Sequence, residues 1–97
     1  MIFADLHYEK HYSDVHLALV TLLVSEFNNV QHGLQGDSLI WVFEGGDKVE
    51  IDTFYSMKHQ IKCSNMRSRA VEKVIEVLRS EYVIFVYSQP EQEPHEV

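Results

Sequence analysis

The sequence predicts an α+β domain in which two helices cover one face of a four-stranded antiparallel sheet. Three observations lead to this expectation. Residues 38–55 (SLIWVFEGGDKVEIDTFY) form an apolar run and an alternating run around a Gly-Gly-Asp turn, the pattern of a β-hairpin. A segment with apolar residues at helical spacing lies on each side of this hairpin. A β-branched and aromatic run, Tyr82–Ser88, then reads as a last strand.

The first elements are a strand and a helix. Residues Ile2–Tyr8 alternate loosely, as a first strand would. Ser13 is a good helix N-cap with Asp14 in the first turn, and an apolar stripe then runs to Phe27. The stripe consists of Val15, Leu19, Leu22, Leu23 and Phe27. Residues Val30–Asp37 contain two glycines and show no period, so we expect mostly loop there, with a short extended piece at Val30–His32 as the alternative.

The turn of the hairpin decides which face of the sheet carries Trp41. A two-residue loop would place Ile40 and Val42 beside the apolar positions of the second strand. A three-residue loop would place Trp41 and Phe43 there instead, because a shift of one residue turns every side chain to the other face. We favour the three-residue loop slightly, because it gathers the large apolar groups and pairs opposite charges across the strands.

The second half repeats the pattern of helix and strand. The second hairpin strand can continue through Met57–Cys63, and Ser64-Asn65 offers the next helix cap. The clearest amphipathic helix follows. Its apolar positions are Ala70, Val71, Val74, Ile75 and Leu78. The strand Tyr82–Ser88 ends this series.

The resulting order, β-α-β-β-α-β, is the split βαβ or ferredoxin-like pattern. We therefore expect residues 1–88 to form a single α+β domain. Residues 89–97, with two prolines and three glutamates, read as a disordered acidic tail. If residues 2–8 do not form a strand, the alternative is an α-β-β-α-β chain with a three-stranded sheet.

Length and composition are those of one globular, acidic domain. The chain has 97 residues, 45% of them hydrophobic and 24% charged, which is enough for one core. The formal net charge of -7 argues against a nucleic-acid partner, because phosphate contacts require an excess of cations. The single Cys63 excludes an intrachain disulfide, and the longest apolar run, Leu17–Val24, is too short to cross a membrane. We expect a cytoplasmic protein without a membrane partner.

The bare face of such a sheet would expose apolar side chains. The first hairpin strand and the last strand are apolar on both faces. Because contiguous exposed apolar patches are uncommon on monomers, we expect a homodimer, or a protein partner, across this face. Partial cover by a loop or the tail is the alternative. The interface candidates are Trp41, Phe43, Phe85 and Tyr87.

Charge asymmetry indicates a second candidate site. Residues 53–71 contain no acid but four of the eight cations of the chain. They surround the expected start of the second helix, where unpaired N–H groups and arginines favour an anion. An anion or acidic-partner site is one interpretation, and solvated side chains are the other. The candidates are Lys58, Lys62, Ser64, Arg67 and Arg69.

Other chemistry-bearing residues form no recognisable motif. Cys63 precedes the second helix, and we expect a partly buried, inert thiol. His7, His11 and His16 lie close in sequence, but there is no H-E-x-x-H and no cysteine pair, so we expect no metal site and no cofactor. Carboxylates on the alternating strand, such as Asp52, are expected to face water.

These observations favour a non-enzymatic protein. No nucleophile elbow, phosphate loop or dinucleotide fingerprint is present. We predict a small binding or interaction protein of accessory, regulatory or immunity type, acting as a homodimer. The alternatives are a small enzyme, or a small-molecule sensor, whose pocket forms in the dimer near the basic start of the second helix.

Overall fold

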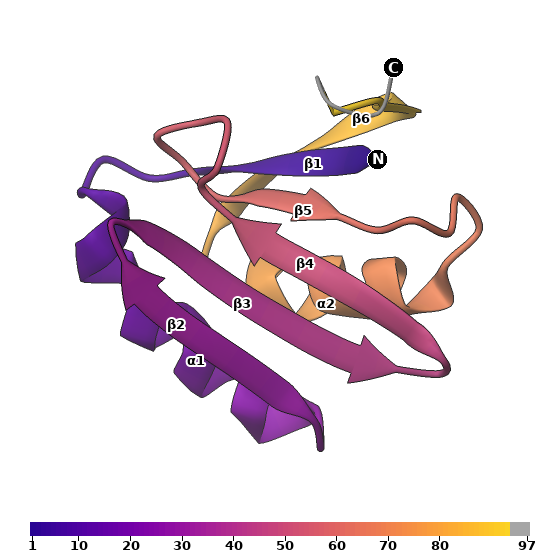
Figure 1. The fold of residues 1–97 in the computed structure, drawn as a ribbon, viewed down its shortest axis with the longest axis horizontal. Coiled ribbons are helices and arrows are strands. Elements are labelled where there is room, and N and C mark those ends of the chain that lie inside the picture. Colours follow the sequence, from indigo (N-terminus) through magenta and orange to yellow (C-terminus); the bar gives the residue numbers. More distant parts are fainter. Residues whose placement is uncertain (94–97) are drawn as a thin grey trace.

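The computed structural model, which describes residues 1–93, shows a six-stranded antiparallel sheet with two helices packed on one face (Figure 1). In chain order the elements are β1 (Ile2–His7), α1 (Tyr12–Glu26), β2 (Val30–Gln35), β3 (Asp37–Glu44), β4 (Asp47–Asp52), β5 (Gln60–Lys62), α2 (Arg69–Arg79) and β6 (Val83–Glu91). The strand order β2-β3-β4-β5-β1-β6 makes β2 and β6 the edges of the sheet. Neither helix is long and apolar enough to cross a membrane.

The predicted four-stranded, ferredoxin-like sheet is wrong, although the fold is α+β with two helices. The segment expected to be a loop is strand β2, which pairs with β3 from Val30↔Val42 to Gln35↔Asp37. Its turn is made by Gly36, at a φ of 76° that favours glycine. An edge strand of mainly exposed polar residues shows no apolar alternation, so the sequence period could not reveal it.

The other added strand is β5, which the sequence did not separate from the hairpin. Residues 53–59 leave the sheet after β4, and the chain returns at Gln60 to pair with both β4 and β1. The sheet therefore has four strands between the helices where the sequence predicted two.

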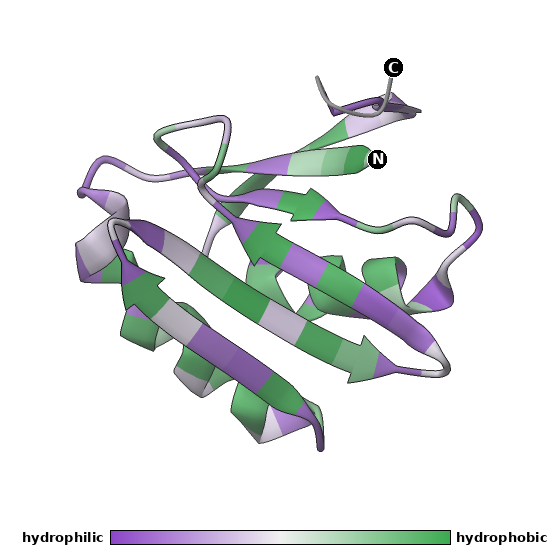
Figure 2. Cartoon of the chain, in the orientation of Figure 1, coloured by the Kyte–Doolittle hydropathy of each residue, from purple (hydrophilic) through white to green (hydrophobic). Residues whose placement is uncertain are grey.

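The hairpin turn contains two residues, and the slightly favoured three-residue loop is wrong. Gly45 and Gly46 have φ values of 58° and 85°, the two positive values that a tight hairpin turn requires. The register is therefore Ile40↔Ile51 and Val42↔Val49, and these side chains are buried. Trp41 lies opposite Glu50 on the other face of the sheet. In Figure 2, β3 is mostly hydrophobic, whereas β4 alternates.

Both helices begin at different caps from those predicted. The ring Nδ1 of His11 accepts from Ser13 N at 3.2 Å and caps α1. Ser68 caps α2, with its Oγ accepting from Val71 N at 3.3 Å. Asn65 instead accepts from Arg67 N in a turn before the helix, a local bond that competes with helix formation.

The hydrophobic core lies between the helices and one face of the sheet. Each strand from β3 to β1 contributes alternate aliphatic residues, and each helix contributes one stripe. The most deeply buried of these residues are Ala4, Leu6, Leu19, Leu23, Ile40, Val42, Val49, Ile51, Ile61, Val74 and Leu78. Full burial of one such aliphatic side chain contributes about 1.5–3 kcal/mol.

Strand β6 extends to Glu91, past the Ser88 boundary predicted for the folded domain. Its pairing with β1 shifts between Ala4↔Val86 and Ile2↔Glu91. Over this interval β1 advances two residues and β6 advances five, so β6 contains three extra residues. Of the predicted acidic tail, residues 94–97 lie outside the described residues.

Candidate functional site

The sheet face away from the helices, called here the open face, has polar residues in its middle and apolar residues at its sides. The register places the side chains of directly paired residues on the same face. The open face consists of Leu39, Trp41 and Phe43 of β3, Lys48, Glu50 and Asp52 of β4, Gln60 and Lys62 of β5, Asp5 of β1, and Val83, Phe85 and Tyr87 of β6.

The middle of the open face holds a buried ion cluster, called here the Lys62 cluster. Lys62 Nζ lies 2.7 Å from Asp52 Oδ1 and 2.8 Å from Glu93 Oε1. Lys62 is 1% exposed, Asp52 0% and Glu93 8%. One ammonium therefore faces two carboxylates away from water, an arrangement in which desolvation is costly and only part of the negative charge is balanced.

The pKa shifts in the Lys62 cluster follow from this geometry. Burial lowers the pKa of the Lys62 ammonium, but hydrogen bonds and charges from Asp52 and Glu93 outweigh it, so the pKa lies above its ordinary value. Burial raises the pKa of the Asp52 carboxyl, and Lys62 reverses only part of this shift. Asp52 Oδ2 has no donor among the described residues. Lys62 thus remains charged, whereas burial favours the protonated form of Asp52.

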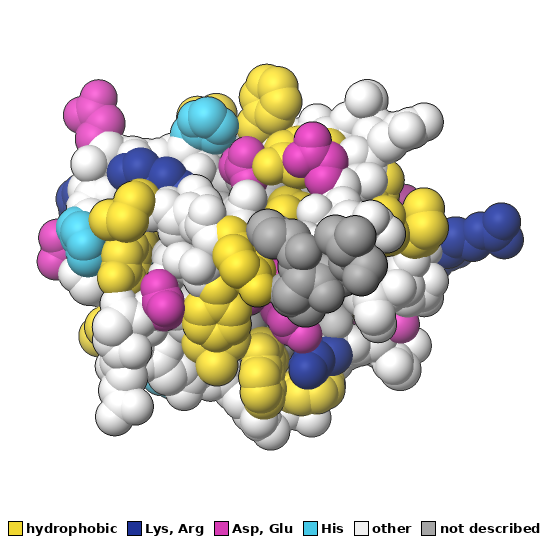
Figure 3. Space-filling view, turned by 45° about the horizontal axis from the view of Figure 1, so that its top comes forward, with side chains coloured by type: hydrophobic (Ala, Val, Ile, Leu, Met, Phe, Trp, Pro, Cys, Tyr) yellow, Lys and Arg dark blue, Asp and Glu magenta, His cyan; other side chains and the backbone are white. Residues whose placement is uncertain are grey.

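Residues 53–59 cover the Lys62 cluster. Phe54 N donates to Asp52 Oδ1 at 3.3 Å, and the rings of Phe54 and Tyr55 lie 5.6 and 4.7 Å from Lys62 Nζ, within cation–π range. A hollow of about 380 Å³ opens between these rings, Ser64 and Glu93. Figure 3 shows hydrophobic side chains gathered on this side of the molecule, with acidic ones among them.

The edge strand β6 exposes apolar side chains on both of its faces. Val83 and Phe85, on the open face, are 71% and 62% exposed, and Val86, on the helix face, is 44% exposed. The side chain of Tyr87 is held against the sheet, because its hydroxyl donates a hydrogen bond to Asp5 Oδ2 at 2.8 Å. Residues 83–87 carry no charge that would discourage pairing with another strand.

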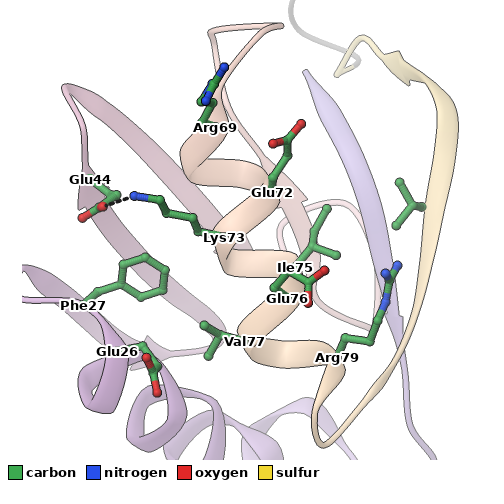
Figure 4. A pocket seen from close by; sticks show the side chains of 11 residues that line it. Glu26, Phe27, Glu44, Arg69, Glu72, Lys73, Ile75, Glu76, Val77 and Arg79 are labelled. Atoms are coloured by element: carbon green, nitrogen blue, oxygen red, sulfur yellow. Dashed lines mark hydrogen bonds and ion pairs between the residues drawn. The ribbon is translucent and has the colours of Figure 1, made fainter.

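Helix α2 lies beside this edge and presents charges of both signs. A shallow groove of about 790 Å³ runs along the helix and includes Val86 of β6. Figure 4 shows Glu72, Glu76 and Arg79 on the side of α2 nearer to β6. On the other side of α2, Lys73 forms an ion pair with Glu44 at the end of β3. The flank of α2 beside β6 therefore combines acidic and basic groups.

A second polar cluster lies on the helix side of the sheet and is called here the Ser–His chain. His59 Nε2 and His16 Nδ1 hydrogen-bond with the same Ser38 Oγ, at 2.7 and 2.5 Å. The other ring nitrogens extend this series of hydrogen bonds. His59 Nδ1 is hydrogen-bonded with Tyr8 OH at 2.6 Å, and His16 Nε2 with His32 Nδ1 at 3.1 Å. The chain joins α1, β2, β3 and the segments flanking β1 and β5.

The Ser–His chain contains a hydroxyl between two imidazoles, which are components of nucleophilic catalysis. Burial, together with the smaller electrostatic effect of His16, lowers the pKa of His59 to about 4. Burial and His32 likewise lower the pKa of His16. Both rings are therefore neutral at neutral pH. Ser38 and His59 are 0% exposed, however, so no substrate reaches the hydroxyl in this conformation. The hydrogen bonds of the Ser–His chain instead hold neighbouring segments together.

The structure brings together only two of the predicted anion-site residues. Lys62 and Ser64 line the hollow beside Phe54 and Tyr55. Lys58 Nζ instead donates to Lys10 O and lies over the Tyr8 ring. Arg67 lies in the turn before α2, and Arg69 lines the groove of α2. The helix start is not at Ser64, so the anion site remains a prediction that rests on Lys62.

The predicted interface residues fall into two groups on the open face. Trp41 and Phe43 lie together on β3, with ring centroids 6.4 Å apart, and Lys48 Nζ lies 4.5 Å from the Trp41 ring. Phe85 and Tyr87 lie on β6, which three strands separate from β3, on the other side of the Lys62 cluster. The two groups do not form a single apolar patch.

Sequence reasoning missed both buried polar clusters. Asp52 was expected to face water, and this is wrong, because residues 53–59 fold over it. His16 was grouped with His7 and His11, for which no site was predicted, but it is 2% exposed at the helix–sheet interface. A histidine within an otherwise apolar stripe of α1 was the available signal, and its partners come from distant segments.

These features define a small α+β protein with a buried lysine–carboxylate cluster on its open face and an apolar edge strand. The chain matches no protein-family model, no curated protein and no solved structure. Its function must therefore be argued from its own surfaces.

Proposed function

We propose that this protein is a small, non-enzymatic interaction protein that acts as a homodimer, with the two protomers joined along the edge of β6. The observation that carries the proposal is the exposure of Val83 and Phe85, at 71% and 62%, on an edge strand that is apolar on both faces. An unpaired strand edge presents free N–H and C=O groups, and natural proteins protect such edges or use them for association.

The two edges of the sheet differ, and this difference selects β6. Strand β2 (VQHGLQ) is mostly polar and contains Gly33, which weakens strand pairing. Strand β6 begins with VIFVY and meets its first proline only at Pro90. A partner strand would therefore find both backbone groups and apolar side chains at β6 but few apolar side chains at β2.

The sequence of β6 is complementary to itself in an antiparallel arrangement. Pairing centred on Phe85 would place Val83 opposite the second copy's Tyr87 and Ile84 opposite its Val86. Such aromatic and β-branched cross-strand pairs contribute about 0.2–1 kcal/mol each. The flank of α2 beside β6 carries charges of both signs, so it offers no single-sign surface that would repel a second copy.

An enzymatic role receives less support. The hydroxyl of Ser38, the nucleophile nearest to a base, is fully buried together with His59. Cys63 is buried as well. An exposed apolar strand edge is suited to binding another chain.

Sedimentation equilibrium from micromolar to millimolar concentration tests the proposal. We expect a dimer whose dissociation constant rises about tenfold or more in Phe85→Glu, because a charge is placed at the centre of the strand pair. Leu17→Glu is the matched control, since Leu17 is 67% exposed but lies on α1. A wild-type monomer throughout, or equal dimerisation of Phe85→Glu and the wild type, would overturn it.

A further inference from the structure

We propose that the hollow beside Lys62 is a receptor for a carboxylate on an extended acidic peptide of a partner protein, and that Glu93 of the chain itself occupies this receptor as a built-in competitor. The inference does not depend on dimerisation through β6. It rests on the Lys62 cluster, on the shape of the hollow and on the path of the segment that delivers Glu93.

The cluster contains one permanent and one exchangeable carboxylate. Asp52 belongs to β4, is 0% exposed and is fixed from the neighbouring backbone by Phe54 N. Glu93 follows the end of β6, and its side chain is 11% exposed at the mouth of the hollow. Withdrawal of Glu93 leaves Lys62 paired with Asp52, a neutral pair, so the site remains electrostatically balanced when the occupant leaves.

The segment that carries Glu93 is the less regular part of β6. Three extra residues separate its end from the regular pairing with β1, and Pro90 lies among them. Such a bulge interrupts the ladder hydrogen bonds. The cost of withdrawing the segment is therefore lower than that of withdrawing a continuous central strand.

The surroundings of Lys62 fit a peptide carboxylate. A lysine ammonium is a point charge that donates readily to one carboxylate oxygen, as Lys62 does to Glu93 Oε1 at 2.8 Å. Phe54 and Tyr55, each 49% exposed, offer apolar area to the residues flanking an incoming glutamate. The hollow of about 380 Å³ accommodates more than the one side chain that reaches Lys62. The present occupant, the carboxylate of Glu93, shows the chemistry that the site accepts.

A tethered competitor lowers the apparent affinity for an external ligand. The receptor is available only in the fraction of molecules from which Glu93 has withdrawn, so the apparent dissociation constant equals the intrinsic one divided by that fraction. Removing the charge of Glu93 should therefore tighten binding of an external peptide. A short linker gives a tethered group an effective concentration in the millimolar range, which sets the strength of this competition.

The test is an NMR titration of ¹⁵N-labelled protein with the acetylated, amidated peptide QPEQE, which is the chain's own segment 89–93. We expect the amide signals of Lys62 and Ser64 to shift, and Glu93→Gln to bind about tenfold or more tightly than the wild type. Glu91→Gln is the matched control, because Glu91 is exposed two residues earlier in the same segment and should leave the affinity unchanged.

A peptide in which both glutamates are replaced by glutamine, QPQQQ, should not bind. Equal binding of QPEQE to Glu93→Gln and the wild type, equal binding of the neutral peptide, or no binding to Glu93→Gln would each overturn the proposal. Acetate that binds to Glu93→Gln as tightly as QPEQE does would contradict the peptide part of it. A thermal unfolding curve of Glu93→Gln close to that of the wild type establishes that the receptor remains folded.

Discussion

Acidification should destabilise this protein through His59, which the fold keeps neutral. His59 is 0% exposed, and both of its ring nitrogens are engaged, by Tyr8 OH at 2.6 Å and Ser38 Oγ at 2.7 Å. Burial, reinforced by His16, lowers its pKa from 6.5 to about 4. In the unfolded chain the ring recovers its ordinary pKa and takes up a proton more easily.

The sign and size of the effect follow from proton linkage. Between about pH 6.5 and about pH 4 the unfolded chain binds a proton that the native protein does not, so stability falls as the pH falls through this window. The pKa difference, at roughly 1.4 kcal/mol per unit, corresponds to about 3 kcal/mol at the acid end. Above the unfolded-state pKa the contribution is fully present. The lowered pKa of His16 acts in the same direction.

Urea unfolding followed by the fluorescence of Trp41 measures this effect between about pH 7 and about pH 4. His59→Gln should be less stable than the wild type at neutral pH, by about 1–3 kcal/mol, because Ser38 and Tyr8 lose a partner. Its stability should nevertheless fall less on acidification, by about 3 kcal/mol. His7→Gln, at an exposed position, is the control and should keep the wild-type pH dependence. Parallel curves for His59→Gln and the wild type would refute the reasoning.

Three further perturbations test the fold, each by urea unfolding. Gly46→Ala should lower the free energy of unfolding by about 1 kcal/mol, because alanine disfavours a φ of 85°. An added Cβ meets nothing within 4 Å, so a larger loss would contradict the open turn. Leu78→Ala should cost about 2–5 kcal/mol and Leu17→Ala less than about 0.5, since Leu78 is 0% and Leu17 67% exposed. Lys62→Met should lower the free energy of unfolding by about 3–5 kcal/mol, because it leaves Asp52 buried without its cation. The double variant with Asp52→Leu should recover at least half of this loss, and no recovery would contradict a buried pair.

The sequence predicted the parts of the fold that rest on local apolar periodicity. Helix α2 has its apolar residues at helical spacing, and those of the predicted stripe, such as Val74 and Leu78, are buried. The hairpin of β3 and β4 and the strand β6 were predicted for the same reason. Strand β2 was not predicted, because an edge strand can be stabilised by backbone pairing alone, with polar side chains on both faces.

The candidate sites were harder to predict, because long-range contacts assemble them. Ser38 meets His16 and His59 from 22 and 21 residues away in sequence. Lys62 was identified as a candidate from the local charge asymmetry, but its carboxylate partners were not. No period within one element indicates that Glu93 reaches Lys62, because that contact joins segments far apart in the sequence.

The two-residue turn at Gly45-Gly46 connects the fold to both functional proposals. By directing Ile40 and Val42 into the core, it places Trp41 on the open face opposite Glu50, and the same alternation places Asp52 there. A carboxylate at that position is tolerated because Lys62 comes from the adjacent strand, and the pair then requires cover from residues 53–59. Charge is thereby concentrated in the middle of the open face. A second copy is consequently better accommodated at the uncharged edge of β6, and an acidic peptide at the centre, where the cation lies.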